Sequence, residues 1–215
     1  MRSARTLILL AVSVLAVGCS VTHPVRVLDE GATRVTASVG GPLIPYHGAT
    51  IPVPYLTAGV AHGITPSRTA FGDVHVLMGT FGVLGANGGM AWKIRDEEGV
   101  RPEVTVLGQA YLFTDLRTMS VVRFFPDAAA AASYRLGESW LTYCSVDIMG
   151  DPWQKRLLVT PALGGQWEGW TGIRLQLELK WMAANIDTRH GIFEGKTSLS
   201  GHGAVGLFLG AGYDL

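Results

Sequence analysis

Asp73 and His75 are the residues best placed for chemistry, because they lie two positions apart on one face of an expected strand. A carboxylate and an imidazole together can act as a general base, which a hydrolase acting on lipid or peptide would need. Asp187, His190 and His202 offer further acidic and imidazole side chains late in the chain. No Gly-x-Ser-x-Gly, His-Glu-x-x-His or phosphate-loop motif accompanies them. The alternative interpretation is that Asp73 and His75 are hydrogen-bonding fillers of an interior.

Eleven charged residues fall on the polar face of the expected strands, six of them basic and five acidic. Charges withdrawn from water must pair or lose their charge, so a nearly balanced set predicts a network of ion pairs. This network either fills an interior structurally or lines a small polar conduit or ligand site. The residues are Arg34, Asp73, Lys93, Arg95, Glu103, Arg135, Asp147, Glu168, Arg174, Glu178 and Lys180.

The elements that must position these residues are β-strands, because apolar and polar residues alternate with period two. In Ile173–Met182, every odd residue is apolar, and the even residues include Arg174, Glu178 and Lys180. About ten such segments predict an all-β fold, an antiparallel up-and-down transmembrane barrel. The Ala128–Ala132 run can equally form a short helix, which leaves eight strands as the alternative. The expected strands are Thr33–Gly40, Pro54–His62, Ala70–Phe81, Leu84–Arg95, Glu103–Phe113, Asp127–Arg135, Trp140–Met149, Arg156–Glu168, Ile173–Met182 and Gly201–Leu215.

The connections between these segments differ in length. Tight turns are expected at Thr65–Arg68, Gly137–Ser139 and Glu168–Thr171, and long loops at Thr114–Pro126 and Ala183–Ser200. Membrane barrels have short turns on the periplasmic side and longer loops outside. With the tight turns inside, both termini lie inside and the strand number is even. The basic, aromatic Thr114–Pro126 loop is either an ordinary rim or a contact for lipopolysaccharide phosphates or a partner.

Composition favours a membrane barrel over a soluble, lipocalin-like one. The chain of 215 residues is 48% hydrophobic and 16% charged, and it contains only 4 lysines. A water-exposed strand face would carry many Lys and Glu, whereas here the polar face is rich in Gly, Ala, Ser and Thr. Trp residues near the expected strand ends suit an aromatic girdle. With 17 basic and 17 acidic residues, the chain has no net field to attract nucleic acid.

The N-terminus has the pattern of a secretory signal: basic Met1–Arg5, then apolar Thr6–Val17. Leu15–Cys19 resembles the lipobox of bacterial lipoproteins, although Leu15 stands one position earlier than that family's leucine. The resemblance implies that Cys19 carries the lipid, including palmitate, and Ser20 after it implies sorting to the outer membrane. Residues 1–18 would then be a signal peptide, 19–32 a lipidated tether and 33–215 the barrel.

The last segment, Val205–Leu215, resembles the closing strand of bacterial outer-membrane barrels, although it ends in Leu215 where that family usually has an aromatic residue. These resemblances imply a lipid-anchored barrel in a Gram-negative-type outer membrane, with its N-terminus on the periplasmic side. Its expected role is structural, interaction or small-solute. Its expected partners are outer-membrane lipids and an envelope protein, with no cofactor and no metal. An outer-membrane hydrolase and a soluble periplasmic binding lipoprotein are the alternatives.

Overall fold

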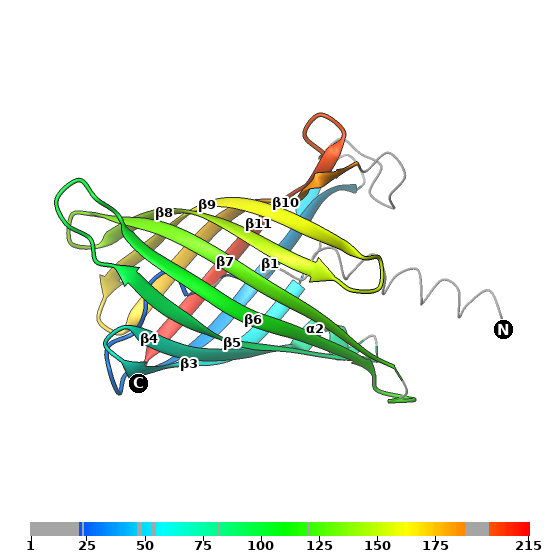
Figure 1. Cartoon of the computed structure of the whole chain (residues 1–215), viewed down its shortest axis with the longest axis horizontal. Coiled ribbons are helices and arrows are strands. Elements are labelled where there is room, and N and C mark those ends of the chain that lie inside the picture. The colour runs from blue at the N-terminus through cyan, green and yellow to red at the C-terminus, as the bar shows by residue number, and fades with distance from the viewer. Residues whose placement is uncertain are drawn as a thin grey trace.

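Period-two alternation carries most of the chain into strands, which join edge to edge into a closed barrel in the computed structural model (Figure 1). The structure describes residues 22, 24–46, 49–52, 55–80, 82–119, 121–187 and 198–215. The strands are β1 (Thr33–Tyr46), β2 (Ala49–Pro52), β3 (Tyr55–Thr65), β4 (Arg68–His75), β5 (Val83–Arg95), β6 (Glu103–Asp115), β7 (Val122–Leu136), β8 (Trp140–Asp151), β9 (Arg156–Trp170), β10 (Ile173–Asp187) and β11 (His202–Asp214).

Ten of these strands form the wall. Each wall strand pairs antiparallel with the next, and β11 pairs with β1 to close the sheet, whereas β2 pairs only with the far end of β1. The predicted ten-stranded up-and-down barrel is therefore confirmed, and the eight-stranded alternative is wrong. The Ala128–Ala132 run forms part of β7, because β6 and β8 pair with it on both sides.

One expected strand, Ala70–Phe81, ends early. β4 stops at His75, and Val76–Thr80 form the short helix α2. Gly82 follows with a φ of 78°, a left-handed conformation that glycine adopts without steric cost and that turns the chain into β5. Met78 of α2 is buried in an apolar cluster at the end of the barrel where β4 passes into β5. No helix among the described residues is long and apolar enough to cross a membrane, a finding that concerns helical spans alone.

Strands occupy part of both long loops expected from the sequence, and the second loop lies partly outside the described residues. Most of Thr114–Pro126 is strand, and residues 116–121 alone connect β6 to β7. β10 likewise continues through Asp187, into the expected Ala183–Ser200 loop. His190 lies outside the described residues. A long basic loop between β6 and β7 is thus a wrong expectation, because strand pairing with β6 extends as far as Val122.

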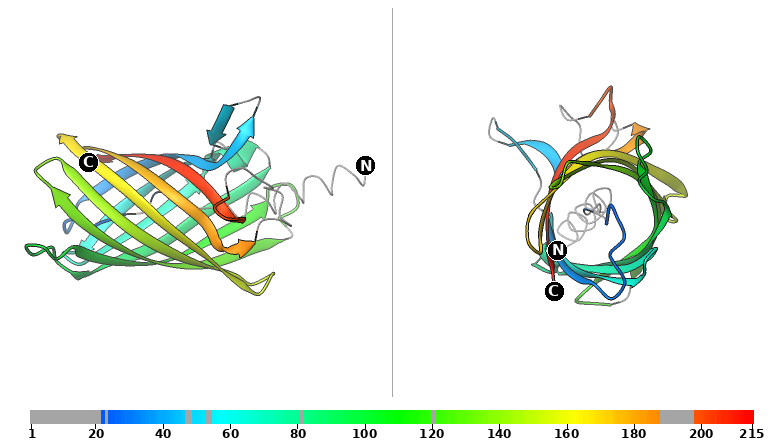
Figure 2. Two further views of the ribbon diagram at one scale, coloured as in Figure 1. Left: turned by 90° about the horizontal axis from the view of Figure 1, so that it is seen from above. Right: turned by 90° about the vertical axis from the view of Figure 1, so that its left-hand side faces the viewer.

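Short turns gather at one end of the barrel, which we call the tight-turn end (Figure 2). β7–β8 and β9–β10 turn there through Gly137 and Gly172, whose φ angles are 69° and 76°. The β3–β4 turn and the 96–102 connection lie at the same end, as do Thr33 and Asp214, where the wall begins and ends. We call the opposite end the loop end.

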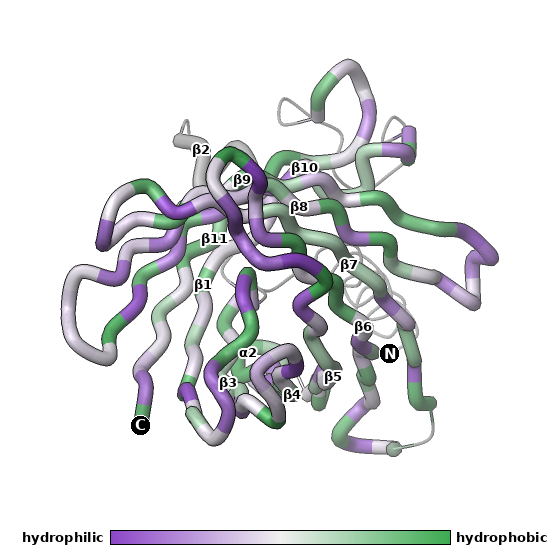
Figure 3. The backbone as a smooth tube through the Cα atoms, turned by 60° about the vertical axis from the view of Figure 1, so that its left-hand side comes forward, coloured by the Kyte–Doolittle hydropathy of each residue, from purple (hydrophilic) through white to green (hydrophobic). Residues whose placement is uncertain are grey.

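Through the middle of the wall the outward face carries no charge, whereas Arg68, the first residue of β4, is exposed at an outward position opposite Trp92. Along the wall strands most outward side chains are apolar and most charged ones point inward, although apolar residues such as Phe113 and Leu141 also face the lumen. Hydropathy therefore alternates along much of the tube in Figure 3. No Asp, Glu, Lys or Arg takes an outward position, which is every second residue, in the spans Thr33–Val39, Leu56–Ile64, Ala70–Val74, Leu84–Ile94, Val104–Leu112, Phe124–Leu136, Thr142–Ile148, Leu157–Trp167, Ile173–Trp181 and Val205–Tyr213. Such a surface suits hydrocarbon and not water.

Aromatic side chains gather at the tight-turn end. Trp140 and Trp170 are more than half exposed, at 55% and 60%, and the ring centroids of Trp167 and Trp170 lie 4.8 Å apart in an edge-to-face arrangement. Trp92 and Tyr213 occupy outward positions near the same end. Such amphipathic rings favour the level of lipid headgroups.

Leu177→Arg and Leu136→Arg test this outward face. Both leucines are about half exposed, at 50% and 53%, but Leu177 lies well inside β10 and Leu136 ends β7 at the tight turn. We expect Leu177→Arg to lower the free energy of unfolding in lipid vesicles by about 2–4 kcal/mol, and Leu136→Arg by about 0–1 kcal/mol. Urea titration of vesicle-inserted protein measures both. Equal costs at the two positions would contradict a membrane-facing wall.

Candidate functional site: the polar lumen

The inward face of the wall encloses a lumen in which bulky side chains stand opposite glycines. Phe113 pairs across the strands with Gly85, and Tyr143 pairs with Gly164. A Cβ on Gly164 would lie 2.2 Å from the Tyr143 ring, and one on Gly85 would lie 2.6 Å from the Phe113 ring. These rings therefore lie along the wall over glycines, which leaves space nearer the barrel axis.

Charges of alternating sign line the tight-turn end, in a series that we call the rim chain: Arg34, Asp214, Arg174, Glu168 and Arg135. Arg34 Nε donates to Asp214 Oδ1 at 2.5 Å, and Arg174 Nε donates to Asp214 Oδ2 at 3.2 Å. Arg174 also pairs with Glu168, whose Oε2 lies 3.0 Å from Arg135 Nη1. The five residues come from β1, β11, β10, β9 and β7, so the rim chain ties the closing strands together.

Deeper in the lumen, Lys180 is fully buried among acidic groups, and we call Lys180, Glu178, Asp147 and Asp127 the buried lysine cluster. Lys180 Nζ lies 3.3 Å from Glu178 Oε2, 3.7 Å from Asp147 Oδ2 and 5.4 Å from the ring centroid of Phe208. Asp127 Oδ2 accepts a 2.6 Å hydrogen bond from the amide of Gln109. One buried cation thus serves several carboxylates, which is stable only while every partner stays in place.

Asp73 and His75 both point into the lumen, but Asn87 stands between them. The Asn87 amide donates to Asp73 Oδ2 at 3.0 Å, and its Oδ1 lies 3.0 Å from His75 Nε2. The other ring nitrogen, Nδ1, pairs with the hydroxyl of Tyr55, and His75 is only 3% exposed. The predicted carboxylate–imidazole pair is therefore an amide-bridged network in which both imidazole nitrogens have partners.

The stretch expected as a tether enters the barrel, and we call residues 24–32 the lumenal segment. In the axial view of Figure 2 its blue trace lies within the ring of strands. Near the tight-turn end, the amide of Gly31 donates to the carbonyl of Gly63 at 2.9 Å, and the amide of Gly63 donates to the carbonyl of Ala32, also at 2.9 Å. Val25 and Leu28 are buried, at 5% and 6% exposure.

Arg26 is the charged anchor of the lumenal segment. Its Nε donates to Ser133 Oγ at 3.0 Å and lies 3.7 Å from Glu103 Oε2, while its Nη2 pairs with Glu97. Glu97 lies in the β5–β6 connection, and the hydrogen bond from Arg26 holds its pKa below the usual range. Glu97 also accepts from the backbone amide of Arg135 at 3.2 Å. Arg26 thus joins the lumenal segment to the rim chain.

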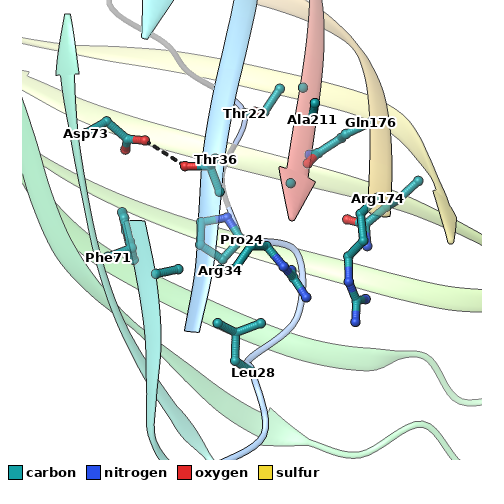
Figure 4. A pocket seen from close by; sticks show the side chains of 14 residues that line it. Thr22, Pro24, Leu28, Arg34, Thr36, Phe71, Asp73, Arg174, Gln176 and Ala211 are labelled. Carbon is teal, nitrogen blue, oxygen red and sulfur yellow. Dashed lines mark hydrogen bonds between the residues drawn. The ribbon is translucent and has the colours of Figure 1, made fainter. Parts of the chain in front are cut away.

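A small cavity of about 50 Å³ remains between the lumenal segment and the wall (Figure 4). Pro24 and Leu28 line it from the segment, and Arg34, Asp73 and Arg174 line it from the wall. The cavity has room for a few water molecules. Among the described residues, no group of three or more His, Cys, Asp or Glu side chains is arranged to hold a metal ion.

Most charged residues predicted for the interior lie on the inward face, but Arg95 does not join them. Register shifts between Lys93 and Arg95, so Arg95 is exposed and donates to the carbonyl of Pro102 at 3.2 Å. Lys93 instead pairs with Asp96 at 2.7 Å. The expectation that Arg95 belongs to the lumenal network is thus corrected by a bulge that the alternation does not reveal.

Several lumenal residues were not among those predicted for the interior. Asp127 and Asp214 stand at inward positions of their strands, so the same alternation could have found them. Arg26 and Glu97 lie outside strands, where no period marks them.

Cys19 lies outside the described residues, and Cys144 is free and exposed on the outer face.

No family model and no curated protein matches the chain. Among solved structures, the NanC porin is similar at 9% identity and a TM-score of 0.47, covering 86% of this chain and 100% of that chain. The translocator domain of autotransporter NalP from Neisseria meningitidis is similar at 10% and 0.47, covering 99% and 94%. An outer membrane channel from Pseudomonas putida F1 is similar at 12% and 0.44, covering 90% and 100%. At these identities the likeness is one of fold.

Lys180→Met tests the buried lysine cluster. Removing the cation leaves buried carboxylates without compensation, so we expect the free energy of unfolding to fall by about 3–5 kcal/mol. Adding Glu178→Gln should recover part of this loss, because one of the uncompensated charges is then gone. Lys155→Met, at an exposed position between β8 and β9, is the matched control and should stay within about 0.5 kcal/mol of the unaltered protein. A similar effect of both lysine substitutions in urea titrations would refute the cluster's stabilising role.

Proposed function

We propose that this chain is an outer-membrane β-barrel protein, held additionally by a lipid on Cys19, whose lumen is a narrow conduit for small solutes. The observation that carries the conduit is the arrangement of bulky side chains over Gly85 and Gly164. The chain's own lumenal segment occupies part of the interior, and wall side chains such as Tyr55, Phe113 and Phe125 pack together at the loop end. A barrel with a purely structural interior would fill its centre from the wall.

The uncharged outward face supports a membrane location. A soluble binding barrel would expose the same face to water, where Leu175, Leu177 and Leu179, each 42% or more exposed, would form an apolar stripe along β10. Contiguous apolar surfaces of this kind mark membrane or protein contacts. The aromatic side chains at the tight-turn end agree with a headgroup boundary there.

The lipobox-like residues Leu15–Cys19 support the anchor and the outer membrane as the destination. The only other cysteine, Cys144, projects from the outward face of β8, so its sulfur is directed away from the lumen. With Cys19 lipidated, Cys144 has no second cysteine with which to form an intramolecular disulfide. If the tight turns lie on the periplasmic side, the start of the wall, Thr33, lies there too. The lipidated Cys19, which precedes Thr33 in the chain, would then lie on the same side.

Cys19→Ala separates the barrel from the anchor. We expect the variant to lose the mass of the lipid but to remain in the membrane fraction after carbonate extraction, because the ten-stranded wall by itself holds the protein in the bilayer. The variant should also keep heat-modifiable mobility on gels, which reports a closed barrel. Intact mass and fractionation of the same preparation measure both properties.

A fully soluble Cys19→Ala protein would overturn the membrane barrel and favour the soluble periplasmic binding lipoprotein. If the unaltered protein itself has an intact mass without acyl groups on Cys19, the anchor alone would be overturned. Cys144→Ala is the matched control, since it removes the other sulfur and should change neither mass beyond the substitution nor fractionation.

A further inference from the structure

The wall is shaped to receive the lumenal segment. A Cβ on Gly63 would lie 2.0 Å from the carbonyl oxygen of Asp29, and one on Gly210 would lie 2.7 Å from Thr22 Oγ1. The Asp29 carbonyl belongs to the backbone, so position 63 needs glycine while the segment is in place, whereas at position 210 the Thr22 side chain would have to move aside. The amide of Leu28 also donates to Thr69 Oγ1 of β4 at 2.7 Å, a buried hydrogen bond between the segment and the wall.

The contacts of the segment are specific yet separate from those that close the barrel. β1 and β11 are joined by nine paired positions, from Arg34–Asp214 to Pro42–Gly206, without the segment. Asp29, Glu30 and Gly31 are exposed, while Val25 packs on Leu141 and Tyr143. The wall is therefore closed by its own strands, and the segment can leave without unpairing them.

A lipid on Cys19 opposes this docking. Thr22 lies inside the wall beside Gly210, four residues from Asp214 at the end of β11. Cys19 stands three positions before Thr22, which limits the distance between their Cα atoms to about 11 Å. The hydrocarbon that the acyl chains require lies on the other side of the wall. A stretch from Ala32 to Cys19 that runs outside the barrel can instead extend to about 45 Å.

We propose that residues 24–32 are a displaceable plug of the lumen, and that insertion of the Cys19 lipid into the membrane withdraws them and opens the conduit. This inference rests on the proposed conduit and the proposed lipid anchor. Docked, the plug closes the space beside Gly63. Withdrawn, it leaves a path bordered by the rim chain and by Asp73.

Thiol labelling measures docking independently of conduction. Val25→Cys with Cys144→Ser places one reporter thiol at a buried position of the plug. In the unlipidated background, with Cys19→Ser, a membrane-impermeant maleimide should label this thiol slowly, at least tenfold slower than in the lipidated chain. Adding Arg26→Glu to the unlipidated chain should raise the rate to the lipidated level, since Glu97 and Glu103 then repel the segment. Adding Glu30→Lys, a charge reversal at an exposed position, is the matched control and should leave the rate low.

Conductance in planar bilayers then measures whether withdrawal opens the lumen. The unlipidated chain should be closed to potassium chloride, while the lipidated chain and unlipidated Arg26→Glu should conduct. Gly63→Val offers a second route, since its side chain overlaps Asp29; Gly88→Val is its control, because a Cβ there meets its nearest atom at an ordinary 3.6 Å. Heat-modifiable mobility confirms that each variant forms the barrel.

Labelling and conductance together show which part of the proposal fails. Fast labelling without conductance in the lipidated chain and in unlipidated Arg26→Glu would overturn the conduit, and with it the plug's purpose. Conductance of unlipidated protein with a slowly labelled thiol would keep the conduit and overturn the plug. Slow labelling and no conductance in a chain whose lipidation is verified by mass would overturn withdrawal by the lipid. Absence of the lipid from the unaltered chain would overturn the anchor while Arg26→Glu still tests the plug.

Discussion

The separation of apolar and charged side chains across a closed wall is the constraint on which this structure depends. Because successive residues of a strand point to opposite faces, a charge in the middle of a wall strand must occupy the inward parity. A slip of one residue in pairing would move an entire set of side chains to the other face. In β10, such a slip would exchange Leu177 and Leu179 with Glu178 and Lys180. The closed hydrogen-bonded register, fixed between β10 and both its neighbours, prevents that exchange.

Charges confined to the lumen then need partners within it, and the two charged groups solve this differently. The rim chain alternates sign between strands at the tight-turn end, where its members keep partial contact with water. The buried lysine cluster has no such contact and relies on Lys180. Glycines opposite large side chains complete the arrangement, since they let rings and amides lie along the wall. The lumenal segment occupies the space that remains.

Alternation predicted about ten strands, with eight as the alternative, and the inward parity of residues such as Arg174 and Glu178; the up-and-down order rested also on the lengths of the connections. It failed where period two is not the governing rule. Val76 and Met78 alternate as in a strand, yet the chain turns into α2 there. Arg95 departs from the lumen because of a bulge. Arg26 finds its partners through a segment with no regular structure, so neither its position nor its pairing with Glu97 has a signature in the sequence.

The most direct measurement of the central claim, that odd and even residues face lipid and lumen, is nitroxide scanning of Ile173–Met182 in lipid vesicles. One spin label at a time would be placed along this part of β10, and its collisions with oxygen and with a water-soluble nickel reagent compared. We expect odd positions such as Leu175 and Leu177 to show high oxygen and low nickel collision rates, alternating with the reverse at even positions such as Gln176. Odd positions that collide freely with the nickel reagent would show that this face meets water, and would contradict the membrane barrel.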